Sequence, residues 1–559
     1  MSGIDTELPD PFNENWDSEL GLWIGDAKYN RTGHGIRNNA KMLVEAGILG
    51  LLERVPAETV LGKLRQAQET NGQLRGNFWW AWEDGKVTDR NSGFFTTIQL
   101  LALKHEFEDQ LSSAGRADLE QMLGEAEHWF AHKVLPVEEK KLRYPNAYLG
   151  DAVCLWLIRE HAGTLDSAYG RTFRKILAWY RDNHWGWGEH LSDIYAKVCQ
   201  RELTALLMWS KELDDDARCL ATELMRELMT IDTVFDGGPR VPTLRCYSME
   251  KSPCTPEAWA KSFQPYRNRM RSQAPVAGFG FAYLAARRGL FRDLPLPAFD
   301  SPERDVACYG NTKAASWVTA RYRYGTMSVY PLFEDTNANA GWGLHWQSMP
   351  VAFWHAAGDW GYLQWLSEER GVVHALPGLS RADTQKNQLC RLSDIDTEAT
   401  HGLTYGTRHD NALLIYRELP RIAASWPWAA DRFRLVHPTA NADAEDLGDW
   451  QRLVLDFGTE KLTVACHPLQ KGTVCTLSRQ TVSNLSEQDS GDRENRELHF
   501  SAHHKLSDQR PEKLRFLWFI RMGETASTPP QVKDMGNTLT AVFSRSDTIR
   551  FAEQTGWER

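Results

Sequence analysis

Three loops in the first half of the chain carry side chains that could move protons or bind a negatively charged group. They read WWAWEDGKVTDRN (79–91), RYPNAY (143–148) and HWGWGEHLSDIY (184–195). Each loop precedes an apolar helical pattern, and Asp, Asn and Ser at such positions are typical helix caps. Capping accounts for Asp89, Asn91, Asn146, Ser192 and Asp193. It does not account for the larger polar residues beside them, which are Glu83, Arg90, Tyr148, Glu189, His190 and Tyr195.

The types of these residues are those that move protons and bind carboxylates. A Tyr or His side chain can remove or donate a proton. Asn and Arg can neutralise charge that develops on a carboxylate.

Tryptophan is abundant, with 23 in 559 residues, and many Trp lie beside Gly, His and acids. Aromatic faces in clefts stack on sugar rings, although Trp is also a large core residue. The clustering indicates a carbohydrate ligand. The residues expected to contact substrate in these loops are Trp80, Trp82, Asn91, Tyr148 and Trp187. In the second half, GWGLHWQSMPVAFWH supplies His345 and Trp346, and a structural His is the alternative interpretation of His345.

The segment 233–273 contains seven Lys and Arg residues, Arg240 among them, in a chain whose formal charge is -10. It precedes an apolar helix and is expected to lie over the same mouth, where its positive field would suit a carboxylated substrate. Arg245, Tyr247 and Arg267 are the candidate binding residues within it. A solvated basic loop is the alternative.

Pairs of helical patterns position these loops. The more apolar members are 33–53, 91–108, 146–163 and 192–213, with a fifth at 275–289. The amphipathic members are 57–70, 115–135, 167–184 and 215–231. A ring that buries inner helices on both faces and outer helices on one would produce this alternation. We predict an α/α toroid, possibly incomplete, and an elongated superhelix of hairpins would give the same pattern.

From about residue 305 the chain changes to short runs that alternate apolar and polar residues between Gly, Asp, Asn and Pro. This texture predicts a large antiparallel β-sandwich, with 369–411 as a connection between strands. The predicted fold is a multidomain α+β protein with a toroid over 1–300 and a sandwich over 301–559.

A toroid followed by a sandwich of this size resembles the polysaccharide lyases of the heparinase II/III, chondroitin and alginate classes. Gly188-Glu189-His190-Leu191-Ser192-Asp193-Ile194-Tyr195 resembles the G-E-Y-x-S-x-x-Y segment of helical-toroid proteins. The resemblance implies a lyase that cleaves uronic-acid-containing glycans by β-elimination, in which a Tyr or His removes the C5 proton and a Tyr returns a proton to the leaving oxygen. It implies Tyr195 as the proton donor, His190 as its assistant, and Asn146 with Arg90 as the pair that neutralises the uronate carboxylate. Glu189 belongs to the same catalytic group, where it would orient the substrate.

Two other functions remain open. A glycoside hydrolase needs two carboxyl groups, which Glu83 or Asp89 with Glu189 or Asp193 could supply. A noncatalytic carbohydrate-binding protein would need only the Trp clusters. A Ser hydrolase and phosphoryl or dinucleotide chemistry are disfavoured, because the G-x-S-x-G, P-loop and G-x-G-x-x-G motifs do not occur in suitable contexts.

The overall charge disfavours nucleic acid or an anionic membrane as a partner. The first residues lack the features of a signal peptide, so a cytoplasmic location is expected. Nine scattered Cys without a CxxC pair give no sign of a metal site, and no cofactor is expected. The expected partner is an acidic oligo- or polysaccharide, and the sequence carries no signal for an oligomeric state.

Overall fold

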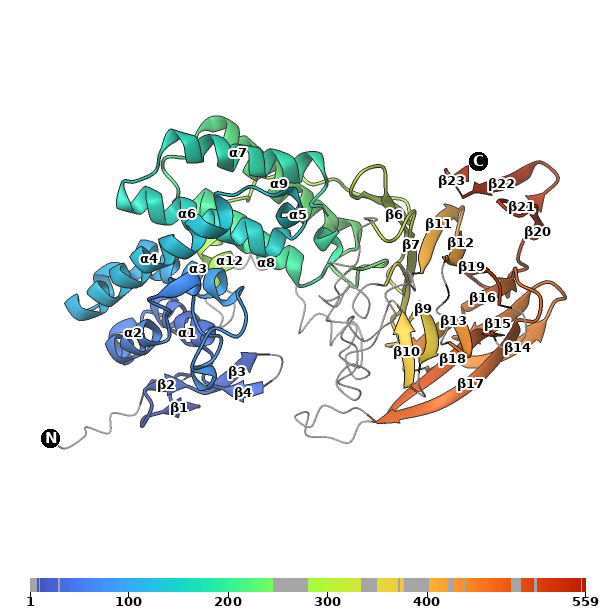
Figure 1. Cartoon of the computed structure of the whole chain (residues 1–559), viewed down its shortest axis with the longest axis horizontal. Helices are drawn as coiled ribbons and strands as arrows, with labels where there is room; N and C mark the ends of the chain where they lie inside the picture. Colours follow the sequence, from blue (N-terminus) through green and yellow to red (C-terminus); the bar gives the residue numbers. More distant parts are fainter. Residues whose placement is uncertain are drawn as a thin grey trace. The chain divides into compact units, whose positions relative to one another are not determined.

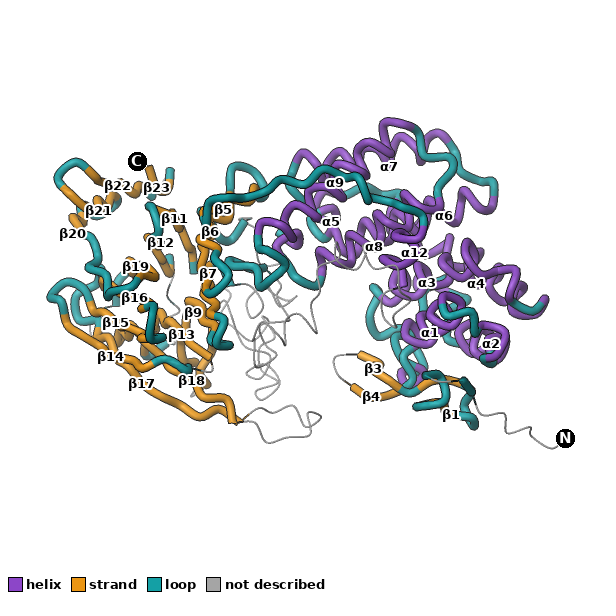
Figure 2. Tube along the Cα trace, turned by 180° about the vertical axis from the view of Figure 1, so that it is seen from behind, coloured by secondary structure: helices purple, strands orange, loops and turns teal. Residues whose placement is uncertain are grey.

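The structure is a computed structural model, and the part of the chain that it describes has several gaps. The described residues are 8–9, 11–28, 31–186, 188–244, 280–332, 349–369, 372–376, 402–420, 422, 426–436, 438–483, 494–506, 510–553 and 555–558. The chain divides into two compact units. Unit 1 comprises Met1–Gly186, Ala196–Thr230 and Pro265–Leu296, and unit 2 comprises Trp187–Tyr195, Ile231–Gln264 and Pro297–Arg559. Helices dominate unit 1 and strands dominate unit 2 (Figure 2).

Unit 1 consists mainly of helical hairpins (Figure 1). The apolar helices are α1 (Ile36–Ile48), α3 (Ser92–Phe107), α6 (Pro145–Ala162), α8 (Tyr195–Trp209) and α12 (Gly280–Arg287). The amphipathic helices are α2 (Ala57–Gln66), α4 (Ser113–Val134), α7 (Ser167–Asp182) and α9 (Asp215–Val234), and a short α5 (Glu139–Leu142) precedes α6. All nine expected helices are present, so this part of the prediction is confirmed.

The two kinds of helix bury different fractions of their surface. Most residues of α3 and α6 are buried around the whole helix. In α7 the buried residues are Tyr169, Phe173, Ile176, Leu177 and Tyr180, whose spacing of three or four defines one face. Inner helices packed on both sides and outer helices packed on one produce this difference.

The apolar helices form a closed ring within unit 1. Helix α1 contacts α3, and α3 contacts α6. The Trp156 indole of α6 donates to Ser210 at the end of α8, and Trp209 of α8 packs on Phe281 of α12 at 5.4 Å between ring centres. Helix α12 in turn contacts α1. The last contact distinguishes a toroid from an open superhelix, because an open array leaves its first and last hairpins apart.

Two short hairpins precede the ring, and the sequence analysis did not anticipate them. They pair β1 (Trp16–Asp17) with β2 (Leu22–Trp23) and β3 (Gly25–Lys28) with β4 (Arg31–Gly33). Asn39 of α1 holds the first hairpin, since its side chain accepts from Trp23 N at 2.7 Å and donates to Trp23 O at 3.1 Å.

The described residues of unit 2 form three antiparallel sheets. The largest contains β5 (Glu303–Ala307), β6 (Lys313–Val318), β7 (Tyr322–Met327), β8 (Val351–His355), β9 (Trp360–Glu369), β10 (Val372–Leu376), β13 (Trp428–Val436), β17 (Val474–Ser483) and β18 (Glu494–Lys505). The second contains β11 (Leu403–His409), β12 (Ala412–Leu419), β14 (Asn441–Asp446), β15 (Gln451–Asp456), β16 (Lys461–Pro468) and β19 (Leu514–Gly523). The third contains β20 (Gln531–Asp534), β21 (Thr538–Ser544), β22 (Asp547–Ala552) and β23 (Gly556–Glu558).

The first two sheets enclose a common apolar core, which confirms the predicted sandwich. Phe353 and Phe433 of the first sheet belong to the same buried cluster as Ile415 and Trp518 of the second. One part of the sequence prediction is wrong: β10 and β11 lie inside 369–411, which was expected to be a connection. Strand β11 was missed because Gly406 and several polar residues weaken its apolar signal.

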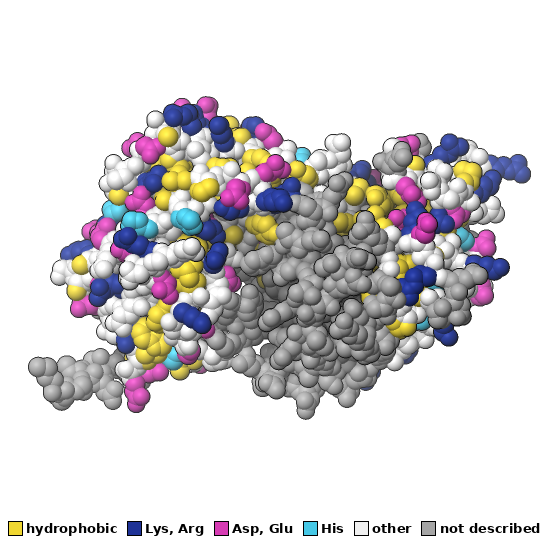
Figure 3. Space-filling model, in the orientation of Figure 1, with side chains coloured by type: hydrophobic (Ala, Val, Ile, Leu, Met, Phe, Trp, Pro, Cys, Tyr) yellow, Lys and Arg dark blue, Asp and Glu magenta, His cyan; other side chains and the backbone are white. Residues whose placement is uncertain are grey.

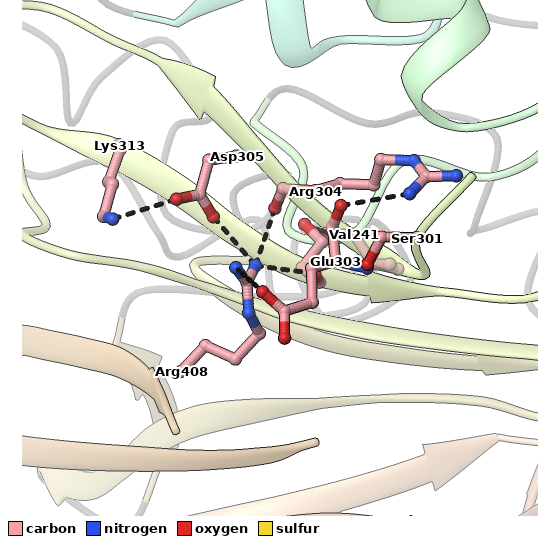
Figure 4. Close-up of polar contacts among 8 residues, drawn as sticks. Val241, Ser301, Glu303, Arg304, Asp305, Lys313 and Arg408 are labelled. Atoms are coloured by element: carbon pink, nitrogen blue, oxygen red, sulfur yellow. Dashed lines mark hydrogen bonds and ion pairs between the residues drawn. The ribbon is translucent and has the colours of Figure 1, made fainter. Parts of the chain in front are cut away.

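Two arginines join the sheets by polar contacts. Arg417 of β12 donates two hydrogen bonds of 2.8 Å to Asp431 of β13, and both side chains are fully buried. Arg408 of β11 reaches the first sheet, where it donates to Asp305 Oδ1 at 2.8 Å and to the carbonyls of Arg304 and Ser316 at 3.0 and 2.9 Å (Figure 4).

The other face of the first sheet is covered by two segments of unit 2. Val241 and Leu244 pack with Leu191 against residues of the sheet such as Trp354 and Tyr362. Ser316 of β6 donates to the Val241 carbonyl at 2.6 Å. The first part of the basic segment is therefore a structural layer rather than a solvated loop.

On the face shown in Figure 3, basic and acidic side chains are interspersed over the coloured surface. None of the described helices has both the length and the apolar character of a membrane span.

Candidate active site

The segment 188–195 begins with a glycine that the local packing requires. Gly188 has φ +98°, and a Cβ placed on it would lie 2.3 Å from Leu244 Cδ1. An L side chain would therefore be strained by its backbone conformation and would also clash with a buried neighbour. The glycine allows the short 3-10 turn Glu189–Leu191 to pack closely against residues 241–244.

Arg240 holds this turn through its backbone. Its Nη1 donates to the carbonyl oxygens of His190 and Ser192, each at 2.6 Å. Thr243 Oγ1 donates to the intervening carbonyl, that of Leu191, at 3.0 Å. The guanidinium is only 4% exposed, and Nη2 forms an ion pair with Asp232 Oδ1 at 2.6 Å. Three successive carbonyls are thus fixed by side chains that are themselves buried.

This arrangement corrects one interpretation of the sequence. Arg240 was counted with the basic residues expected to attract a carboxylated substrate. In the structure its guanidinium interacts with Asp232 and with the protein backbone. Its role is to position the turn.

His190 is buried in the same turn, with 1% of its surface exposed. Its Nε2 lies 2.9 Å from the carbonyl oxygen of Ala307, so that nitrogen carries the proton, and 3.7 Å from Cys308 Sγ. These contacts fix the plane of the imidazole ring and its tautomer. Glu189 beside it is equally buried.

Tyr195 is the first residue of α8, and Ser192, the expected cap, lies three residues before it. Ser192 Oγ accepts a hydrogen bond from the Tyr195 backbone N–H at 3.1 Å. Ser192 and Asp193 are buried, whereas Tyr195 is only partly buried. A phenol on a capped helix end, joined to a clamped turn, has its backbone position fixed before any ligand binds.

In unit 1, Asn146 does not cap a helix, so capping does not explain why an Asn stands at this position. Pro145 begins α6, Tyr144 occupies the cap position, and Asn146 is the second helical residue. Its side chain is 4% exposed. Proline favours the first helical position because its missing N–H has no partner there, so the helix starts one residue earlier than expected.

Tyr148 has contacts that support a packing role instead of the predicted contact with substrate. It is 2% exposed, and its hydroxyl donates to the Val134 carbonyl at 2.9 Å. Burial raises the pKa of Tyr148 above its usual value.

The loop before α3 leaves Arg90 exposed and Asn91 partly buried. Asp89 Oδ1 accepts the Asn91 N–H at 2.9 Å, while Asn91 occupies the cap position without a capping hydrogen bond from its side chain. The Arg90 carbonyl accepts from Asn77 Nδ2 at 3.1 Å. The backbone of Arg90 is therefore held while its side chain extends outward.

Trp80 and Trp82 are both partly exposed in this loop. Trp80 packs edge-on against Phe95 at 5.6 Å between ring centres. Trp82 contacts Trp79 at 5.7 Å, and Lys63 Nζ lies 4.9 Å from its ring. Partly exposed rings of this kind suit contact with a sugar face.

Glu83, a carboxyl considered for hydrolysis, is bound by His34. The Glu83 Oε1 atom lies 2.6 Å from His34 Nδ1 and accepts the His34 backbone N–H at 3.0 Å. Partial burial raises the pKa of Glu83, but hydrogen bonds from its own backbone and from His34 outweigh it, so the pKa lies below its usual value. A general acid in a glycosidase needs the opposite shift.

Sequence reasoning missed a polar network on the first sheet. Glu497 accepts from Arg434 Nε at 2.8 Å and lies 2.7 Å from His499 Nε2. Burial raises the pKa of Glu497, but His499 and Arg434 together lower it to about 2. The signal was present as a polar residue at alternate positions of ELHFSAHHK, which places Glu497 and His499 on one face of β18.

Asn146 and Arg90 belong to unit 1, and Tyr195 and His190 belong to unit 2. Their convergence on one substrate stays a prediction. Six further candidates lie outside the described residues: Trp187, Arg245, Tyr247, Arg267, His345 and Trp346. Within the described ranges no three His, Cys, Asp or Glu side chains are grouped as metal ligands would be.

Comparison with solved structures found polysaccharide lyases. A chondroitin AC lyase from Streptomyces coelicolor A3, in complex with chondroitin sulphate, is 12% identical with a TM-score of 0.48, over 92% of this chain and 79% of that one. Heparinase III is 11% identical with a TM-score of 0.44, over 84% of this chain and 76% of that one. A heparan sulfate lyase from Pedobacter heparinus is 10% identical with a TM-score of 0.35, over 84% and 75%. These are among the lyase classes that the sequence was expected to resemble. No family model and no curated protein matches the chain.

Proposed function

We propose that the protein is a lyase that cleaves uronic-acid-containing oligo- or polysaccharides by β-elimination, with Tyr195 as its proton donor. One observation carries the proposal: a partly exposed Tyr195 stands on a capped helix end whose preceding turn is clamped by Arg240 and Thr243. Catalytic groups work best when the protein fixes them before the substrate arrives.

In the proposed reaction a base removes the C5 proton of the uronate, the C4–O4 bond breaks and a C4–C5 double bond forms. Tyr195 protonates the departing O4 oxygen, and it or His190 accepts the C5 proton. Asn146 and Arg90 would neutralise the charge that builds on the uronate carboxylate. The ring of His190, fixed by its hydrogen bond to Ala307, would assist Tyr195 through its other nitrogen.

The interaction of Glu83 with His34 lowers the pKa of the Glu83 carboxyl, which suits Glu83 to the base or nucleophile of a hydrolase and not to its general acid. The substrate would be an acidic glycan, and a cytoplasmic location would favour short oligosaccharides over polymers.

The test incubates the protein with a panel of uronic-acid oligosaccharides and records two signals. Elimination creates a conjugated 4,5-unsaturated uronate, which absorbs in the ultraviolet, whereas hydrolysis creates a reducing end without that absorbance. Unsaturated product supports the proposal. Reducing ends without absorbance would establish the hydrolase, and binding without either signal would establish the noncatalytic alternative.

A further inference from the structure

We propose that Arg37, Phe95 and Arg201 of unit 1, together with Trp80, form a binding subsite for the anionic substituent of a sugar, either a carboxylate or a sulfate ester. This inference concerns binding and not the proton transfer assigned to Tyr195. It rests on the proposed function in one respect, which is that the ligand is an acidic glycan.

The first step is the meeting of three inner helices at one aromatic ring. The guanidinium carbon of Arg37 lies 5.6 Å from the centre of the Phe95 ring, and that of Arg201 lies 5.2 Å from it. Arg37 is on α1, Phe95 on α3 and Arg201 on α8. Helices α3 and α8 are separated in the ring by α6, so side chains from both that meet must point toward the interior of the ring.

The second step is the charge of this cluster. Two guanidiniums within 6 Å of one ring concentrate positive charge in a chain of formal charge -10. Arg201 Nη2 lies 3.8 Å from the buried Glu202, a long ion pair, and Arg37 donates to the neutral amide oxygen of Asn38 at 3.0 and 3.2 Å. Both remain charged, since the guanidinium does not lose its proton in proteins.

The third step is the geometry that aromatic contact imposes. A guanidinium stacked near a ring presents its N–H groups at its edge, and that fork matches the two oxygens of a carboxylate or sulfate. The chain positions this edge near the first turns of α1 and α3, since Arg37 is the second residue of α1 and Phe95 the fourth of α3.

The fourth step connects the anion with a sugar ring. Trp80 lies edge-on to Phe95 at 5.6 Å, and its own ring is 5.9 Å from the Arg37 guanidinium carbon. Arg37, Trp80 and Phe95 are all partly exposed. A pyranose against Trp80 would therefore have its charged substituent within reach of the Arg37 guanidinium.

The experiment measures binding by isothermal titration calorimetry in the full-length Tyr195→Phe protein, so that turnover does not interfere. The probes are an unsulfated uronate tetrasaccharide, the same tetrasaccharide with its carboxylates reduced to alcohols, and a sulfated tetrasaccharide. Arg37→Gln and Arg201→Gln are each expected to weaken binding of an acidic probe on the order of tenfold, and to flatten its salt dependence. Arg37→Lys keeps the charge but loses the fork, so its affinity should be intermediate.

The matched control is Arg287→Gln. Arg287 is another exposed Arg of unit 1 with an aromatic partner, 5.9 Å from the Tyr283 ring on α12. Its loss is expected to leave binding unchanged. Thermal unfolding of each variant checks the fold, and Arg37→Gln decides alone if Arg201→Gln unfolds.

The outcomes separate this inference from the proposed function. Elimination is assayed separately in the protein that retains Tyr195. Arg-dependent binding, with no elimination by the protein that retains Tyr195, would support the subsite and refute the lyase. Elimination by that protein, with full affinity in both Gln variants, would refute the subsite and leave the lyase standing. Equal affinity for the acidic and the reduced probe would also overturn the subsite, and preference between the two acidic probes identifies carboxylate or sulfate as its ligand.

Discussion

Arg240 and Asp232 form an ion pair of 2.6 Å in which both side chains are more than nine-tenths buried. Asp232 is near the end of α9, and Arg240 follows it by eight residues. The Arg240 guanidinium, which donates to the carbonyls of His190 and Ser192, is buried away from water. A guanidinium buried there without a counter-charge would be very unfavourable. Asp232 supplies that counter-charge, and its negative charge therefore stabilises the buried guanidinium of Arg240.

Replacing Arg240 by Ala is expected to lower the free energy of unfolding by about 3–5 kcal/mol, because Asp232 is left buried without its cation. Activity should fall through kcat more than through KM, since the turn before Tyr195 loses its fixed geometry. Arg240→Lys retains the charge and should recover part of both. The surface pair Arg181 with Asp182 supplies the control, as Arg181→Ala should change neither quantity. If Arg240→Ala kept full kcat, the clamp would have no part in catalysis.

The helices could be predicted because the burial of one face, or of the whole helix, determines the spacing of apolar residues in the sequence. Phe173, Ile176 and Tyr180 of α7 recur at helical spacing, and the inner helices lack a polar face. Ring closure could not be predicted in this way, because it depends on a contact between α1 and α12, which are more than 200 residues apart.

The polar contacts of the site were less predictable than the fold. The hydroxyl of Ser192 binds the first helical N–H, as expected from its place just before an apolar helical pattern, because that contact depends only on the next three residues. The hydrogen bond from Arg240 to the His190 carbonyl joins residues fifty positions apart, and no local pattern predicts it. Capping, the alternative interpretation of Asn146, does not apply because Pro145 is the first residue of the helix.

The Arg417–Asp431 pair between the two sheets offers a second test. Both side chains are fully buried, Trp518 Nε1 also donates to Asp431 at 2.8 Å, and Thr404 accepts from Arg417 at 2.8 Å. Arg417→Met alone should destabilise unit 2 by about 3–5 kcal/mol, because it leaves a buried carboxylate. The double change Arg417→Met with Asp431→Leu should cost less than the single one. Chemical denaturation measures both, and a double variant less stable than Arg417→Met would contradict this account.

His105 is expected to make the stability of unit 1 depend on acid. Burial lowers the pKa of His105 to about 4, from an ordinary value of 6.5, with the nearby His161 contributing. The unfolded chain therefore takes up a proton below about pH 6.5, while the folded chain resists protonation until about pH 4. Stability is lost as the pH falls through this window, by roughly 3 kcal/mol over its full width.

The variant that tests this is His105→Phe. In the native protein the centres of the His105 and Trp209 rings lie 5.2 Å apart and their planes differ by 9°, and a Phe keeps an aromatic ring in that stack. Far-ultraviolet circular dichroism during unfolding should show a weaker loss of stability between pH 6.5 and 4. His184 provides a control of opposite sign, because its hydrogen bond to Glu227 raises its pKa. That contribution is present below the unfolded pKa and disappears as the pH rises through the folded one. An unchanged pH profile in His105→Phe would show that other groups titrate.

Tyr195→Phe and two carboxyl variants decide between elimination and hydrolysis. Tyr195→Phe removes one oxygen from a partly exposed side chain, so the fold should persist while the rate falls about 10²–10⁴-fold through loss of general acid–base catalysis. Glu189→Gln retains the buried shape of the turn and should reduce elimination much less. Glu83→Gln removes the carboxylate that holds His34 and should affect stability more than rate, because an ionised Glu83 is unsuited to be an acid. Asn146→Ala should slow elimination and is not expected to slow a reaction driven by a carboxyl pair.

Product formation is followed by ultraviolet absorbance and by reducing ends on the same samples. Full activity in Tyr195→Phe together with its abolition in Glu189→Gln would replace the lyase with a hydrolase.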